Sequence, residues 1–139
     1  MRAKSRDLDA AAVVLMAVAL VLEALPFGVA MVFAAGPTER IVETYSYFSL
    51  LPLGYANVAP MLTGIMTAVA TLLGVVVLAR PNSAFGFRRA ALLCGIAALL
   101  SSVLPLFLFG AVSMTAVSYA VSGAILLSVC LLAVAGRRA

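Results

Sequence analysis

The chain has 139 residues, of which 65% are hydrophobic and 10% are charged, and its formal net charge at pH 7 is +4. A typical soluble domain is about half apolar and roughly a quarter charged, and a chain of this length cannot enclose so much apolar surface in its own core. The composition therefore excludes an ordinary soluble domain and predicts one membrane domain over residues 1–139, with the lipid bilayer as its main partner.

The first predicted helix covers residues 10–35 and is expected to cross the membrane. About 20 apolar residues span a bilayer core, and Glu23 is the only charged residue in this longer run. A signal peptide has an apolar region of about 7–15 residues, so we expect this helix to be retained. Pro26 predicts a kink within the helix, and Gly36-Pro37 predicts its end.

Three more spans are predicted from the rest of the chain. Pro60 suits the first position of a helix over residues 60–79. The run 90–136 contains no charged residue and is too long for one span, so it predicts helices at residues 90–109 and 113–135 with a turn near Gly110. The predicted fold class is an all-α integral membrane protein, built as a bundle of four transmembrane helices.

The basic residues predict the orientation of these helices. Cytoplasmic loops of membrane proteins carry an excess of Lys and Arg, so we expect both termini in the cytoplasm, with the protein in the plasma membrane of a bacterium. Arg40 is the one basic residue on the other side. Short clusters at helix ends do not form the basic surface of a nucleic-acid-binding protein. The clusters on the predicted cytoplasmic side are Arg2, Lys4 and Arg6, then Arg80, Arg88 and Arg89, then Arg137 and Arg138.

The segment 36–59 is predicted to lie outside the cell, and it is rich in aromatic residues. Tyrosines at this level commonly anchor a protein at the headgroup layer, but they are also candidate contacts for a ligand or partner. The segment lacks clear periodicity and is too apolar for a free loop. We expect it to lie on the membrane surface or to fold over the mouth of the bundle, with its tyrosines partly buried. The candidate contacts are Tyr45, Tyr47, Phe48, Tyr55 and Asn57.

Glu23 is the strongest candidate for a functional residue. A carboxylate in hydrocarbon costs several kcal/mol unless it is protonated, paired or hydrated, so such residues are candidates for proton or ligand binding. The alternative is structural, with Glu23 hydrogen-bonded to a neighbouring helix. Counting 1.5 Å per residue, hydroxyl groups on the other three helices lie at nearly the same depth as Glu23, about 20 Å from the cytoplasmic helix ends. The candidate intramembrane site comprises Glu23, Thr67, Ser101, Ser102 and Ser122.

The sequence holds no pattern of a catalytic or metal site. It contains no histidine, and Cys94 and Cys130 lie in apolar runs without a CxxC spacing. Acid–base and nucleophilic catalysis normally rely on groups that support the reacting residue, and the sequence offers none for Glu23. We therefore expect no enzymatic activity, no cofactor and no metal, and we expect both cysteines to be free thiols.

Two resemblances follow from these residues. The stretch 44–64, TYSYFSLLPLGYANVAPMLTG, resembles a motif of small bacterial proteins with four transmembrane helices, which implies that topology but no activity. Glu23 is similar to the membrane-embedded glutamate of the small multidrug resistance transporters, which are short four-helix proteins. There the glutamate binds protons and cationic drugs competitively, in a dimer. This chain has no tryptophan, a long segment 36–59 and no matching glycine pattern in its third helix, so that resemblance covers one residue.

Two functions are consistent with the sequence: a non-enzymatic accessory or scaffold subunit, or a proton-coupled small-molecule transporter that uses Glu23 in an oligomer. Small residues recur every four positions, which allows close packing within the chain or in a homo-oligomer or with a membrane-protein partner. A hydrated cavity reaching Glu23 would favour transport, whereas a dry Glu23 held by hydroxyls would favour the scaffold. The small residues are Ala90, Cys94, Ala98 and Ser102, and then Ala116, Ala120, Ala124 and Ser128.

Overall fold

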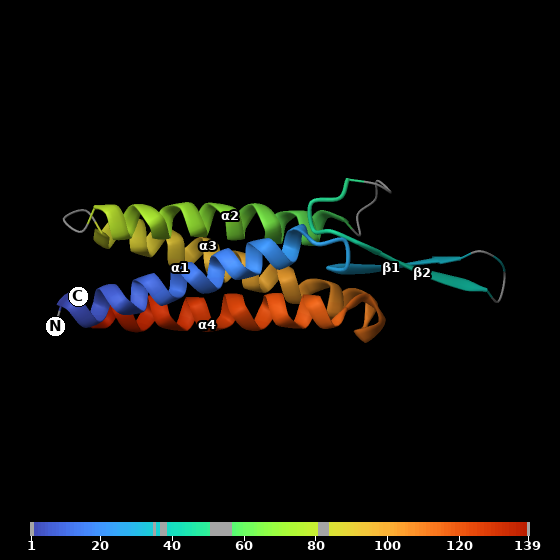
Figure 1. Cartoon of the computed structure of the whole chain (residues 1–139). Helices are drawn as coiled ribbons and strands as arrows, with labels where there is room; N and C mark the ends of the chain where they lie inside the picture. The colour runs from blue at the N-terminus through green and yellow to red at the C-terminus, as the bar shows by residue number, and fades with distance from the viewer. Residues whose placement is uncertain (1, 35, 37–38, 51–56, 81–83, 139) are drawn as a thin grey trace.

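The computed structural model describes residues 2–34, 36, 39–50, 57–80 and 84–138 (Figure 1). Long helices lie side by side in an elongated bundle, and a two-stranded sheet extends from one end of it. The predicted set of four long helices is confirmed within these residues. The elements are α1 (Arg2–Ala24), β1 (Val29–Ala34), β2 (Arg40–Tyr45), α2 (Val58–Ala79), α3 (Ala84–Phe109), the short 3-10 helix η3 (Ala111–Ser113) and α4 (Ala116–Arg138).

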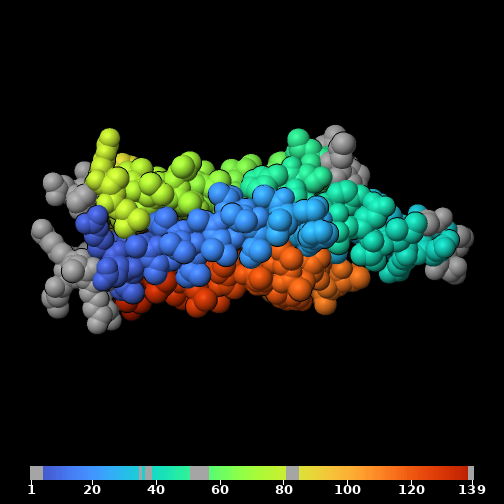
Figure 2. All heavy atoms as spheres, viewed as in Figure 1, coloured from blue at the N-terminus to red at the C-terminus, as the bar shows by residue number. Residues whose placement is uncertain are grey.

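Helices that follow one another in the chain are neighbours in the bundle. α1 packs against α2 and α4, and α3 also packs against α2 and α4, so α1 and α3 face each other across the diagonal. In Figure 2, α1 lies in front between α2 and α4, and the strands extend beyond the end of the bundle. Both ends of the chain lie at the opposite end of the bundle from the strands (Figure 1).

Three of the helices are long and apolar enough to cross a membrane, over residues 58–79, 85–109 and 116–137. Large apolar side chains such as Leu72, Leu93 and Leu127 lie exposed on their outer surfaces, as hydrocarbon rather than water would favour. α1 is the fourth helix and is amphipathic, since it carries Asp9 and Glu23 on its buried face.

The first helix is shorter than predicted and is followed by a strand. It ends at Ala24. Pro26 has no backbone donor and disfavours helical geometry at the residue before it, while the β-branched Val29 and Val32 favour an extended chain. The predicted helix over residues 10–35, with a kink at its proline, is therefore wrong beyond its first half.

β1 and β2 form an antiparallel hairpin, so the predicted all-α class is confirmed only in part: the fold is mostly helical, with one two-stranded sheet. The register pairs Val29 with Tyr45 and Ala34 with Arg40. The rings of Phe33 and Tyr45 meet edge to face, with their centroids 6.5 Å apart. The prediction failed because β1 continues the apolar run of the first helix without a change in hydropathy. Strand pairing depends on side-chain contacts with a partner, which a hydropathy pattern does not contain.

The other helix ends lie close to their predicted places, except the start of α3. The break at Gly110 is confirmed, and its φ of 77° is a conformation that glycine adopts readily. α4 begins with a reciprocal cap, because the Ser118 amide donates to the Thr115 hydroxyl and the Thr115 amide donates to the Ser118 hydroxyl, each over 3.1 Å. α3 begins at Ala84 rather than near residue 90, since arginine is a good helix former even where hydropathy ends.

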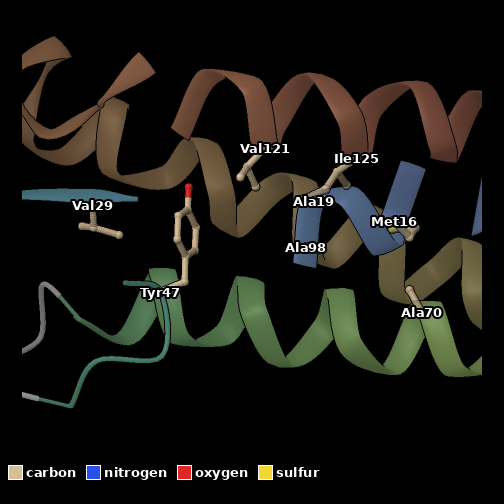
Figure 3. Close-up of a cluster of buried hydrophobic side chains, with 8 residues drawn as sticks. All are labelled: Met16, Ala19, Val29, Tyr47, Ala70, Ala98, Val121 and Ile125. Carbon is tan, nitrogen blue, oxygen red and sulfur yellow. The ribbon is translucent and has the colours of Figure 1, made fainter. Parts of the chain in front are cut away.

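The core of the bundle contains side chains from all four helices and from the hairpin (Figure 3). Small residues bring the helices close together. A Cβ atom added at Gly74 would lie 2.6 Å from a methyl group of Val13, so α1 and α2 approach each other too closely there for any other residue. The buried cluster comprises Met16, Ala19, Val29, Tyr47, Ala70, Ala98, Val121 and Ile125.

Candidate functional site

Glu23 points into the bundle, as predicted. Its side chain is fully buried, and it lies on the same face of α1 as the buried residues Ala12, Met16 and Ala19, a spacing that repeats along one side of a helix. The hydroxyl of Thr67 on α2 donates a hydrogen bond to Glu23 Oε1 over 2.8 Å. The contact between Glu23 and Thr67, which share a depth in the bundle, is therefore present.

The second carboxyl oxygen of Glu23 makes no such contact. Oε2 is buried and has no hydrogen-bond partner among the described residues. Buried polar atoms of this kind are uncommon in folded proteins, and each one marks a place where the fold gives up some stability. Among the described residues, Glu23 therefore joins α1 to α2 through Oε1 alone.

A second hydroxyl contact joins α2 to α3. Thr63 lies one turn before Thr67, and its Oγ1 lies 2.9 Å from Ser101 Oγ. Each threonine hydroxyl also lies 2.9 Å from a carbonyl oxygen of the preceding turn of α2, a contact that hydroxyl groups inside helices often make. Ser101 therefore contacts Thr63 rather than Glu23. The sequence analysis missed Thr63, although its spacing of four residues from Thr67 placed it on the same helix face.

A third contact joins α3 to α4. Ser102 Oγ and Ser122 Oγ lie 3.0 Å apart, and Ser102 also donates to the carbonyl of Leu99. The predicted site is thus not one cluster around Glu23. Its members form separate pairs at three helix–helix interfaces, and each pair resembles the hydroxyl contacts that hold membrane helices together.

Tyr47 adjoins Glu23 at the hairpin end of the bundle. Its backbone amide donates to the Glu23 carbonyl over 3.0 Å, and its ring points across the bundle away from α2 (Figure 3). A Cβ atom at Gly28 would lie 2.7 Å from this ring, so the absence of a side chain there makes room for it. Burial raises the pKa of Tyr47 to about 12, and a hydrogen bond with Ser118 opposes part of that rise.

The start of α4 holds the base of the hairpin. The Thr115 hydroxyl lies within hydrogen-bonding distance of the Phe27 and Gly28 carbonyls, at 2.8 and 3.1 Å, and the Ser118 hydroxyl donates to Gly28 as well. Val29 adds a backbone bridge to Met114. Thr115 and Ser118 were not predicted, although the pair spaced by three residues before an apolar run is a recognisable helix-start pattern.

A small cavity lies between β1, Tyr47 and the hairpin ends of the helices. It is about large enough to hold one water molecule. Five of its nine lining residues carry a hydroxyl group, and Glu23 is not one of the nine. The lining residues are Val29, Tyr47, Pro60, Ser101, Ser102, Pro105, Ser113, Met114 and Ser118.

The other candidates in the outer segment are placed differently from one another. Tyr45 is half-buried in β2 and donates a hydrogen bond to Glu43, which raises the pKa of Tyr45. Phe48 is partly exposed, yet its ring covers Gly64 on α2. Asn57 is buried and donates to the Ser49 carbonyl over 3.3 Å. Tyr55 lies outside the described residues. The expected burial is thus confirmed most fully for Tyr47.

The opposite end of the bundle holds an ion pair that the sequence analysis did not predict. Arg88 of α3 donates from Nε to Asp9 Oδ1 over 3.0 Å and from Nη2 to Asp9 Oδ2 over 2.6 Å. The two side chains are 9% and 4% exposed. The hydroxyl of Ser5 lies between Arg88 and the Ala135 carbonyl of α4. Arg88 is therefore an internal cross-link and not a free cytoplasmic charge.

No protein-family model, curated protein or solved structure matches this chain. The two resemblances drawn from the sequence therefore stay predictions, and the chemistry of the site comes from its geometry alone. Cys94 and Cys130 are free, as expected. No group of three or more His, Cys, Asp or Glu residues comes together in the part of the chain that the structure describes.

Proposed function

We propose that the chain is a multi-pass protein of the bacterial plasma membrane that acts as a non-enzymatic accessory or scaffold subunit. The observation that carries this proposal is the complete burial of Glu23, with its hydrogen bond from Thr67. A carboxyl group held in this way serves to fasten α1 to its neighbour. A group that exchanges protons with water needs an aqueous route, and Glu23 is absent from the lining of the cavity described above.

In this proposal α1 is the fourth membrane span. Its 23 residues would measure about 35 Å at 1.5 Å per residue, comparable to a hydrocarbon core of about 30 Å. Its buried acidic side chains are compensated, because Asp9 pairs with Arg88 and Glu23 accepts from Thr67. α1 also packs against α2 and α4, two of the helices that are apolar enough to span.

The charges support an orientation with both termini in the cytoplasm. Arg6, Arg80, Arg89 and Arg137 are exposed at the end of the bundle where the termini lie. The hairpin at the other end carries Glu39, Arg40 and Glu43. Since positive charge accumulates on the cytoplasmic side of membrane proteins, the hairpin would face the cell exterior.

The hairpin is the element best suited to meet another protein. It extends beyond the helices (Figure 1), and Ile41 and Val42 of β2 are about half exposed. Each strand is paired on one side only within the sheet, and apart from the bridge between Val29 and Met114 no described residue pairs with the other side. A scaffold subunit would present this hairpin on a base fixed by Tyr47 and Thr115.

Proton-coupled transport is the alternative, and one observation favours it. Oε2 of Glu23 is buried without a hydrogen-bond partner among the described residues, and a second conformation that supplied one would give Glu23 two states. A transporter of this kind would use that change, in an oligomer, to couple protons to a small molecule.

One variant separates the two functions. Wild-type protein, Glu23→Gln and the control Glu43→Gln are reconstituted in liposomes, and proton flux and thermal unfolding are measured for each. The control removes an exposed carboxyl from the hairpin. For a scaffold we expect Glu23→Gln to fold normally, with unfolding free energy within about 1 kcal/mol of wild type, because the Gln carbonyl still accepts from Thr67. We also expect no proton flux above empty liposomes from any of the three.

Proton flux in wild type and in Glu43→Gln, but not in a normally folded Glu23→Gln, would overturn the scaffold proposal and establish the transporter.

A further inference from the structure

We propose that the outer face of α3 around Arg89 binds an anionic phospholipid. The lipid phosphate lies at the guanidinium group, and an acyl chain lies along the apolar side chains that follow. We call this surface the Arg89 face; it comprises Phe85, Arg89, Leu93, Ile96 and Leu100. The inference rests on the membrane insertion of α3 and not on the role of Glu23.

The Arg89 face is continuous and uncovered. Residues at these spacings lie on one side of a helix. Phe85, Leu93 and Leu100 are each at least 60% exposed, and Ile96 is 38% exposed. The buried residues of α3, such as Ala91 and Ala98, lie on the other side. An apolar stripe that reaches about 16 Å from Arg89, at 1.5 Å per residue, therefore leads directly away from a single cation.

The guanidinium group of Arg89 lies against a ring, and no described residue accepts a hydrogen bond from its N–H groups. Its central carbon lies 4.0 Å from the centre of the Phe85 ring, an arrangement in which the ring attracts the cation. Stacking uses the face of the guanidinium plane, so the N–H groups at its edge can still bind two oxygens of one phosphate. Arg88, in contrast, directs its donors at Asp9 inside the bundle.

The surrounding charge favours an anion at this end of the bundle. Arg6, Arg80 and Arg137 are exposed there, while Asp7 is the exposed acid among the described residues of α1. Basic clusters beside membrane spans attract anionic headgroups. A free phosphate ion would satisfy the guanidinium alone, whereas a phospholipid also covers Leu93 and Leu100. The geometry therefore points to the lipid.

The chain contains no tryptophan, so a single introduced tryptophan reports on its own position. Leu93→Trp places the reporter on the Arg89 face. Phe107→Trp places a matched reporter on the same side of α3, 14 residues further along, at a position that is 79% exposed. Each protein is reconstituted in vesicles in which brominated phosphatidylglycerol or brominated phosphatidylcholine quenches tryptophan fluorescence. The ratio of quenching gives the relative affinity for the two lipids at each reporter.

We expect phosphatidylglycerol to bind about fivefold more strongly than phosphatidylcholine at Leu93→Trp, as one nearby arginine would give, with no preference at Phe107→Trp. Adding Arg89→Gln should remove the preference at Leu93→Trp, Arg89→Lys should retain most of it, and Arg40→Gln in the hairpin should leave it unchanged. Far-UV circular dichroism checks that each variant is folded.

Equal preference at both reporters, or a preference that survives Arg89→Gln, would overturn the proposal. Soluble glycerol phosphate in millimolar excess distinguishes the two sources of phosphate. We expect it to leave the quenching ratio unchanged. If it abolishes the preference, the site binds the free anion and the assignment to a lipid is wrong.

Discussion

At the scale of single residues, each polar side chain buried at the level of Glu23 contacts a polar side chain of an adjacent helix. Glu23 meets Thr67, and Ser102 meets Ser122. Such a hydrogen bond contributes little net free energy when it forms, but leaving a buried group unpaired costs more. The fold therefore accommodates the buried Glu23 chiefly because Thr67 donates a hydrogen bond to it.

We expect Thr67→Val to lower the free energy of unfolding by about 1–3 kcal/mol, because Glu23 then loses its donor and stays buried. Thermal unfolding in detergent measures the change. Thr71→Val is the matched control, since the Thr71 hydroxyl bonds to the Thr67 carbonyl within α2, and we expect it to cost less than about 0.5 kcal/mol. Equal losses in both variants would show that the contact with Glu23 has no special role.

The raised pKa of the buried Tyr47 phenol predicts that the protein loses stability at alkaline pH. Its pKa is raised from 10 to about 12 by burial, so the fold favours the neutral phenol. That stabilisation is fully present below pH 10 and is lost as the pH rises from 10 towards 12, by about 2–3 kcal/mol at 1.36 kcal/mol per unit. We expect the difference in unfolding free energy between wild type and Tyr47→Phe to decrease by that amount over this range. A difference independent of pH would contradict the burial of the hydroxyl.

At the scale of elements, the hairpin has a fixed base and a free tip. Its base is tied to α1 through Tyr47 and to α4 through Thr115 and Ser118. A two-stranded hairpin alone is only marginally stable in water. Contacts with the helix ends therefore supply the order that the sheet itself lacks.

We expect a cysteine at Glu43 to react with a membrane-impermeant maleimide in intact cells, because the hairpin would lie outside. A cysteine at Gly86, which is exposed near the start of α3, should react only after the cells are permeabilised. Both are placed in a background in which Cys94 and Cys130 are alanine, since Cys130 is exposed. Labelling of the cysteine at position 86 in intact cells would contradict the proposed topology and place that end of the bundle outside the cell.

Sequence patterns predict an element correctly where a local signal, such as an apolar run or a glycine, decides its structure. They fail where pairing with another segment of the chain decides it. The apolar run after Pro60 and the turn at Gly110 are local signals, and both agree with the structure. β1 differs, because its apolar residues suit a helix equally well until β2 pairs with them. The Glu23–Thr67 contact followed from shared depth. The ion pair between Arg88 and Asp9 was not predicted, because an arginine near a helix end usually faces water.

At the scale of the whole molecule, one ion pair crosses the bundle. Asp9 and Arg88 join α1 to α3, which face each other across the diagonal. Their two parallel hydrogen bonds fix both position and orientation. An ion pair therefore joins the helices at this end of the bundle, whereas Tyr47 and hydroxyl groups join them at the hairpin end.

We expect Asp9→Asn to reduce the free energy of unfolding by about 3–5 kcal/mol, because it leaves the Arg88 cation buried without its counter-charge. The double variant Asp9→Leu with Arg88→Met should restore most of the loss, since an apolar pair needs no compensation. Arg137→Gln removes an exposed charge and is the control. A small effect for Asp9→Asn would mean that water reaches this pair in the membrane.

The contacts of α1 also set an order of events during synthesis. α1 is made before its partners, which are Thr67 in α2 for Glu23, Arg88 in α3, and in α4 Ser128, whose hydroxyl donates to the Ala12 carbonyl over 2.8 Å. Until α2 emerges from the ribosome, α1 would bring an unpaired carboxyl group into lipid. If α1 is the fourth membrane span proposed above, its buried carboxyl group acquires a partner only after α2 is made. Of the described helices, α1 is the one whose contacts are completed latest after its own synthesis, since its partner Ser128 lies in α4.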